Sequence, residues 1–390
     1  MRMRRTISAL VGLLLAGVAV APAAYARTAR PEQWHLDAMQ AEDAWKIGTG
    51  QGVTVAVIDT GVGRIPELDG QVVPGKDFSH GYEGDERTDY DDHGTGMAAL
   101  IAGTGRRPSG DGALGLAPDA KILPLRVSEG GGNLRLHQSI AEAVRFAADS
   151  QAQVLNISFG GPGRSEELDA AVRYALDKGK LVFSSVGNDG EGTNEVMYPS
   201  GSPGVVGVAA VDADGEATRE SQHGPQVDLS APGFDIVTGC TGDSGSDSGL
   251  CTEHGTSEAT ALVSASAALL WSAHPDWTND QVLRVMLDTA DKPEPVHGIE
   301  RNDSIGYGVA RPATALLTPG DPGPADAFPL PDLAAPASPT QEPAPVPALA
   351  FQARTWEGAL GLLPWVVLGA GACLLTGGAV TAIVVQRVKR

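Results

Sequence analysis

Hydrophobic and polar positions alternate in blocks along the first half of the chain. Short apolar runs predict strands at residues 53–62, 121–127, 154–160, 181–188 and 205–212. Between them, apolar residues recur at helical spacing and predict helices at residues 93–103, 139–151 and 165–179. Buried strands connected by helices favour a parallel sheet covered on both faces, so the pattern predicts an α/β fold with a mostly parallel central sheet flanked by helices. Further on, Thr278 and Gln281 form a capping box ahead of another helix.

Polar residues gather at the ends of three predicted strands. Asp59 closes the first strand, Asn156 and Ser158 lie late in the third, and Asn188 closes the fourth. In sheets of this kind, functional sites form at the carboxyl ends of the strands. We therefore expect these side chains at one edge of the sheet.

The two ends of the chain differ from this body. The basic start MRMRR, an apolar run and the sequence Ala24–Tyr25–Ala26 predict a signal peptide at residues 1–26; a membrane anchor is the alternative, but the run is short. Residues 360–386 carry no charge and precede a basic tail at 387–390, which predicts a single transmembrane helix with a cytoplasmic C-terminus. Residues 318–359, rich in Pro and Ala, predict an extended linker after a globular body at 27–317.

The net charge limits which classes of partner the chain can bind, and the cysteines indicate a disulfide. The formal net charge is −20 although both ends of the chain are basic, so the body is strongly acidic. This argues against binding of nucleic acid or of anionic lipid. Cys240 and Cys251 bracket a polar loop in an exported domain and predict a disulfide. A metal pair is the alternative, but no second Cys/His pair stands at a usable spacing.

Four residues carry the candidate chemistry. Taken singly, Asp59 and Asn188 are turn residues, His93 is a surface or capping histidine, and Ser257 is an N-cap serine. Taken together they form a catalytic set, because a serine hydroxyl needs an imidazole to take its proton and a buried carboxylate to orient that imidazole. The Asn188 amide and the Ser257 backbone N–H would then stabilise the oxyanion of a tetrahedral intermediate.

The order Asp–His–Ser is informative, because unrelated folds that use this triad order its members differently. The blocks VAVIDTGV, DDHGTGMAALIAG, SSVGN and GTSEAT resemble the four signature blocks of the subtilisin-like serine proteases. The resemblance covers residues 33–317 and implies a three-layer α/β fold that hydrolyses peptide bonds through an acyl-enzyme. It implies that Asp59 orients His93, that His93 is the general base and then acid, and that Ser257 is the nucleophile. Asn188 and Ser257 would form the oxyanion hole.

The resemblance also implies where a peptide binds. In subtilases an extended substrate adds as a strand between two edge segments. The matching residues are Gly130, Gly131, Gly132, Ser158, Phe159 and Gly160. The glycines are either a plain loop or room for substrate backbone. No cofactor is implied; acidic stretches at 85–92 and 243–247 are possible calcium sites, but they lack a firm ligand pattern and we expect no metal.

The whole plan resembles that of the mycosins, membrane-anchored subtilases linked to type VII secretion. Like them, the chain combines a signal, a catalytic domain, a Pro-rich linker and one C-terminal membrane helix, with only residues 27–46 before the homologous core. This implies a catalytic domain outside the cell membrane and a protein or peptide substrate. The alternative is a membrane-tethered structural partner of a secretion complex with little or no proteolytic activity.

Two positions depart from the family pattern. Glu258 follows the candidate nucleophile, where a small or apolar residue is usual, and Ala261 replaces a proline. A carboxylate facing the site would raise the pKa of His93 and oppose oxyanion charge. In the first turn of a helix, however, glutamate interacts favourably with the helix dipole and can point to solvent. We expect the solvent-facing orientation.

Overall fold

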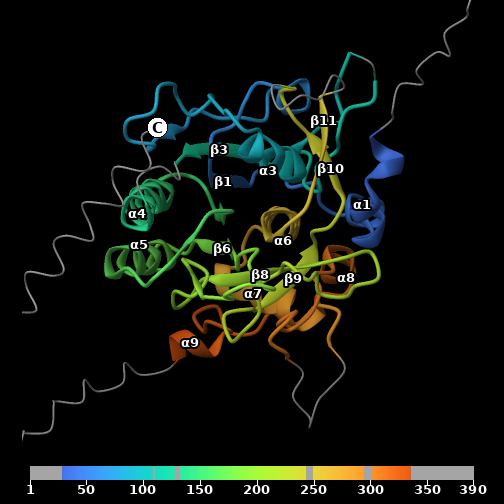
Figure 1. Cartoon of the computed structure of the whole chain (residues 1–390). Helices are drawn as coiled ribbons and strands as arrows, with labels where there is room; N and C mark the ends of the chain where they lie inside the picture. Colours follow the sequence, from blue (N-terminus) through green and yellow to red (C-terminus); the bar gives the residue numbers. More distant parts are fainter. Residues whose placement is uncertain (1–28, 109, 128–131, 243–248, 294–300, 335–390) are drawn as a thin grey trace, which may run out of the picture. The chain divides into compact units, whose positions relative to one another are not determined.

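The computed structural model describes residues 29–108, 110–127, 132–242, 249–293 and 301–334 (Figure 1). The predicted signal peptide, the linker beyond residue 334, the predicted transmembrane helix at 360–386 and the tail at 387–390 lie outside these residues. Within the described ranges, no helix has both the length and the apolar character needed to cross a membrane.

A seven-stranded sheet forms the centre of the body, with strand order β2-β3-β1-β4-β6-β8-β9. Neighbouring strands in it pair in parallel, which confirms the predicted architecture. In sheet order the strands are Lys76–Asp77, Lys121–Arg126, Thr54–Asp59, Val154–Ile157, Leu181–Ser185, Val206–Val211 and Leu229–Pro232. Two antiparallel pairs lie apart from it: β5 (Gly161–Pro162) with β7 (Met197–Tyr198), and β10 (Ile236–Gly239) with β11 (Leu250–Glu253).

Helices cover both faces of this sheet (Figure 1). On one face lie α4 (Asn133–Asp149) and α5 (Glu166–Asp177). On the other lie α3 (His93–Ala102) and α6 (Thr256–Ala273), with α7 (Asn279–Thr289) and α8 (Pro312–Leu317) packed against α6. The shorter helices are η1 (Arg30–Glu32), α1 (Trp34–Ala38), α2 (Ala41–Ala44), η2 (Pro66–Leu68) and α9 (Pro331–Ala334).

The alternation of side chains along β1 explains the three layers. Val55 and Val57 join the apolar core beneath α3 and α6, whereas Ala56 and Ile58 join the core beneath α4 and α5. Successive strand residues point to opposite faces, so a continuous apolar run buries both faces at once. The strand therefore ends in a closed interior, where its last side chain is shielded from water.

Several element boundaries differ from the sequence-based expectation: the strands expected over 53–62, 154–160 and 181–188 end at Asp59, Ile157 and Ser185, and one helix starts earlier than expected. The strand expected over 154–160 ends at Ile157, because Ser158 leaves the sheet and exchanges hydrogen bonds with α6. The helix expected from residue 139 starts at Asn133, directly after Gly132. The predicted capping box at Thr278 is present at the start of α7, and the predicted disulfide joins the two cysteines of hairpin β10–β11.

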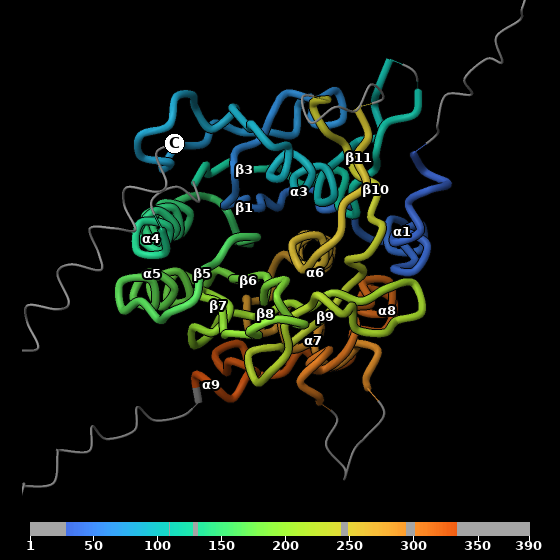
Figure 2. The backbone as a smooth tube through the Cα atoms, viewed as in Figure 1, coloured from blue at the N-terminus to red at the C-terminus, as the bar shows by residue number. Residues whose placement is uncertain are grey.

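The first described residues pack on the body (Figure 2). Gln33 is fully buried, and its Nε2 donates hydrogen bonds to the carbonyl oxygens of Leu114 at 2.8 Å and of Val237 in β10 at 3.3 Å. Trp34 Nε1 donates to the carbonyl oxygen of Phe234 at 3.1 Å. This segment therefore ties the start of the body to the chain between β9 and β10.

The folded body continues past the boundary predicted at residue 317. The chain from 321 to 333 runs along α7, where Gln281 Nε2 donates to the Gly323 carbonyl at 2.9 Å and Arg284 Nη2 donates to the Ala327 carbonyl at 2.6 Å. Leu330 is 1% exposed within the main core. The linker prediction is thus corrected for this part, because α7 supplies hydrogen-bond partners to its backbone.

Replacing Leu330 with alanine should lower the free energy of unfolding by about 2–5 kcal/mol, as for other buried leucines. The matched control is Leu317→Ala, since Leu317 is 57% exposed, and should change that free energy by at most about 0.5 kcal/mol. Denaturant unfolding of the full chain in detergent measures both. Equal effects of the two substitutions would show that residues 321–333 are not part of the cooperative body.

Candidate active site

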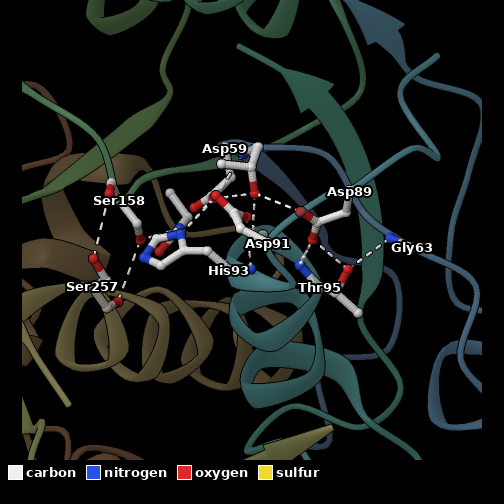
Figure 3. Close-up of polar contacts among 11 residues, drawn as sticks. Asp59, Gly63, Asp89, Asp91, His93, Thr95, Ser158 and Ser257 are labelled. Carbon is white, nitrogen blue, oxygen red and sulfur yellow. Dashed lines mark hydrogen bonds and ion pairs between the residues drawn. The ribbon is translucent and has the colours of Figure 1, made fainter. Parts of the chain in front are cut away.

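The end of β1 and the start of α3 bring Asp59 and His93 into contact (Figure 3). Asp59 is fully buried, and His93 Nδ1 lies 2.7 Å from its Oδ1. Gly94 allows this approach: a Cβ on it would lie 2.1 Å from the Gly61 carbonyl oxygen and 3.0 Å from Asp59 Oδ1. The carboxylate therefore accepts a hydrogen bond from the ring N–H and fixes which nitrogen carries the proton.

Asp89 stabilises the contact between Asp59 and His93 through hydrogen bonds to the residues that flank it. Its carboxylate accepts hydrogen bonds from the Thr95 backbone N–H at 2.8 Å and from the Thr60 hydroxyl at 2.9 Å (Figure 3). The Thr60 hydroxyl in turn accepts from the Gly94 N–H at 2.9 Å. Burial raises the pKa of Asp89 to about 6, against these hydrogen bonds. Asp89 was not predicted from the sequence, because nothing local separates it from the other acids of its loop.

Ser257 lies in the first turn of α6 and is 6% exposed. Its hydroxyl donates to the Ser158 carbonyl oxygen at 3.4 Å, and the Ser158 hydroxyl donates to the Ser257 carbonyl oxygen at 3.3 Å (Figure 3). Among the described residues, no hydrogen bond joins Ser257 to His93 in this conformation. A rotation about the serine Cα–Cβ bond moves the hydroxyl between staggered positions without moving the backbone.

Asn188 follows β6 and is oriented by the start of α6. Its Oδ1 accepts from the Thr256 N–H at 2.9 Å and from the Thr256 hydroxyl at 3.0 Å, so its Nδ2 points the other way, without a partner in the described chain. Gly255 has φ 151°, and its N–H donates to the Gly233 carbonyl at 2.8 Å. The Asn188 amide and the Ser257 N–H, which has no acceptor among the described residues, are two donors at one helix start.

Glu258 is 2% exposed, so the solvent-facing orientation expected from the sequence is wrong. Its Oε2 has no hydrogen-bond partner within the described residues. A Cβ on Gly255 would lie 3.2 Å from this oxygen and 2.8 Å from Asn188 Nδ2, which places the carboxyl group beside the candidate oxyanion donor. Burial raises the pKa of Glu258 to about 7, and the nearby charge of His93 opposes that shift.

The charges around His93 favour its protonated form. Burial of the ring works against that charge, but the carboxylate of Asp59, followed by Glu258 and Asp91, outweighs it and raises the pKa of His93. The side chain is 30% exposed, so solvent screens part of this effect. The Phe159 ring packs edge-on against the imidazole, with ring centroids 5.5 Å apart.

The predicted substrate-binding residues fall into two groups. Ser158 and Phe159 are 6% and 7% exposed and lie beside the candidate nucleophile and imidazole, and Gly160 follows them. Gly132 is the N-cap of α4. The other two glycines, at 130–131, lie outside the described residues.

The acidic loop considered for calcium is held by internal hydrogen bonds. The Asp85 carboxylate accepts from the Thr88 hydroxyl at 2.9 Å and from the Arg87 N–H at 3.0 Å. In the part of the chain that the structure describes, no three His, Cys, Asp or Glu side chains gather as metal ligands. The second acidic stretch, at 243–247, lies outside that part.

The sequence and the structure were compared with known proteins. The Subtilase family profile matches residues 50–308, which include all four candidate residues. The chain is 36% identical over 252 residues to the Thermophilic serine proteinase of Bacillus sp. (strain AK1), a match that covers 64% of this chain and 59% of that protein. It is 33% identical over 260 residues to Subtilisin Savinase of Lederbergia lenta, which covers 66% of this chain and 90% of that one.

Solved structures agree with these matches. The crystal structure of MycP1 from the ESX-1 type VII secretion system is similar with a TM-score of 0.66 and 32% identity, over 76% of this chain and 88% of that chain. These findings confirm the resemblance read from the four sequence blocks, and the similarity to MycP1 agrees with the mycosin branch. The chain belongs to the subtilase family of serine proteases.

Proposed function

We propose that this chain is a membrane-anchored, extracytoplasmic serine endopeptidase that acts in type VII protein secretion. The observation that carries the catalytic part is the 2.7 Å contact between His93 Nδ1 and Asp59 Oδ1, with Ser257 and Asn188 at the adjoining start of α6. A buried carboxylate, an imidazole and a serine at a helix start are the groups that acyl transfer requires.

Each group has one part in the proposed reaction. Ser257 Oγ attacks the carbonyl carbon of the peptide bond while His93 Nε2 takes its proton, and Asp59 stabilises the imidazolium that forms. The Asn188 amide and the Ser257 N–H hold the negative oxygen of the tetrahedral intermediate. His93 then gives the proton to the departing amine, which leaves an acyl-enzyme. Water, deprotonated by the same imidazole, releases the acid and restores the serine.

The secretion role rests on similarity and on the sequence of the two ends. MycP1, one of the similar solved structures, comes from the ESX-1 type VII secretion system. A signal peptide at 1–26 and a membrane helix at 360–386 would hold the body outside the membrane. The strongly acidic body favours a protein or peptide substrate over nucleic acid.

A structural role without proteolysis is the second candidate. Two observations favour it: the Ser257 hydroxyl donates to Ser158, and the carboxyl group of Glu258 lies beside the oxyanion donor. An experiment in cells distinguishes the proteolytic role from the structural one. A proteolytic role requires that Ser257→Ala impair processing of a secreted protein, whereas a structural role requires that secretion fail only when the chain is deleted.

A fluorophosphonate probe should label the parent full chain in detergent and should not label Ser257→Ala, because the probe reacts only with an activated serine. Ser266→Ala is the matched control, since Ser266 is a buried serine of the same helix whose hydroxyl donates to the Leu262 carbonyl, and it should still label. Gel fluorescence measures labelling. An unlabelled but folded parent would contradict the protease proposal and favour the structural one.

The activity should also depend on pH in a defined direction. His93 must be neutral to accept a proton, and its pKa is raised, so kcat/KM should increase with pH through a midpoint above the usual histidine value of about 6.5. Glu258→Gln removes a negative charge that raises this pKa and should move the midpoint to lower pH. Glu167→Gln, an exposed position in α5, should leave it unchanged. An unmoved midpoint in Glu258→Gln would exclude coupling between the two groups.

A further inference from the structure

We propose that this protease selects peptide bonds that are followed by a lysine or arginine, and that Glu253 and Glu258 recognise this cation beside His93. The inference rests on the proposed function and names the substrate class of the same site.

The first support is the buried carboxyl group of Glu258. It is 2% exposed, its Oε2 has no hydrogen-bond partner in the described chain, and it lies beside the Asn188 amide. Burying a carboxylate without a cation or a donor is costly, so such a group is strongly stabilised by a ligand that brings positive charge. Its position next to the nucleophile restricts that ligand to the substrate around the scissile bond.

The second support is the set of acids that surrounds His93. Glu253 and Asp91 are exposed, and both interact electrostatically with His93, as Glu258 does. Within the described residues none of these three acids has a Lys or Arg partner, whereas acids elsewhere on the body do, as in Asp169 with Arg164. Three carboxyl groups without a Lys or Arg partner in the described chain therefore act on the same imidazole.

The chemistry of this cluster points to an organic cation. The described residues contain no group of three or more side chains arranged as metal ligands. His254, next to Glu253, is exposed and packs near the Phe234 ring, with centroids 6.1 Å apart. A lysine or arginine side chain reaches such a site from the substrate backbone and needs no fixed ligand geometry.

The position of Glu253 assigns the cation to the leaving side of the substrate. Glu253 ends β11, and its partner strand β10 packs on α3 through a hydrogen bond from Thr238 Oγ1 to the Gly96 carbonyl at 2.8 Å. The edge Ser158–Gly160, which resemblance assigns to the substrate strand, instead continues into β5 beside α4. Glu253 thus approaches the imidazole from the α3 side, away from the edge that would hold the residues before the scissile bond, and we therefore assign its side to the departing amine.

The contact between the substrate cation and these acids would both recognise the substrate and activate His93 as a base. The negative charges of Glu258 and Asp91 help to keep His93 protonated, and a protonated imidazole cannot take the serine proton. A substrate cation placed among these acids offsets their charge and lowers the pKa of His93. More of the enzyme then carries a neutral base at the moment when the preferred substrate is bound.

The test compares quenched fluorescent peptides that differ only in the residue after the scissile bond, which is Lys, Ala or Glu. A second series varies the residue before it, and mass spectrometry fixes the cleavage site. For the full chain in detergent, kcat/KM should be at least about tenfold higher with Lys than with Glu after the bond, as a charge contact of ordinary strength gives. The Glu253→Gln/Glu258→Gln double variant should reduce this ratio to below about twofold.

Glu167→Gln is the matched control, because Glu167 is an exposed glutamate in the first turn of α5, and it should keep the parent ratio. Three results overturn the inference: equal rates with Lys and Glu, a charge preference only before the bond, or a ratio unchanged in the double variant. Fluorophosphonate labelling distinguishes the two levels. If the parent is labelled and any of these results is found, only the inference is contradicted. If the parent is folded but unlabelled, the proposed function is contradicted as well.

Discussion

The hydrogen bond between Asp59 and His93 requires α3 to approach the end of β1 more closely than any side chain on Gly94 would permit. The helix cannot turn to relieve this contact, because Asp89 holds its first turn through Thr95 and Thr60. Burial on both faces of β1 keeps water from the carboxylate. The geometry of the pair is thus a property of the packed sheet and helix together.

The start of α6 supplies the other side of the site. Thr256 holds the Asn188 side chain by its oxygen, so the amide nitrogen faces outward before any substrate arrives. Preorganised donors of this kind cost no reorganisation when charge develops. The buried carboxyl group of Glu258 lies beside these donors, and its negative charge would oppose the charge of the oxyanion. A bound cation that offsets the carboxylate would reduce this repulsion.

Strands β1, β3, β4, β6 and β8 and the clustering of the candidate residues were predictable from the sequence, because apolar runs, glycines and strand-end polar residues are local signals. Asp59, His93 and Ser257 each stand in such a block, and the structure gathers them at one edge of the sheet. The direction of Glu258 was not predictable, since a first-turn glutamate satisfies the helix dipole whether it is exposed or buried. The segment at 321–333 was missed because its partners in α7 are distant in sequence, and Asp89 because nothing local separates it from the other acids of its loop.

The residues that precede the matched family region are connected to the site through hydrogen bonds. Gln33 and Trp34 bind the chain around β10, and Gly233, next to the carbonyl that Trp34 contacts, accepts the hydrogen bond from Gly255. The beginning of the folded chain is therefore linked, in three short steps, to the turn that presents the serine. A cut made beyond Trp34 would remove these hydrogen bonds from the segment that supports that turn. The fold itself thus gives the residues around position 33 a part in supporting the turn before the serine, although they stand far from it in sequence.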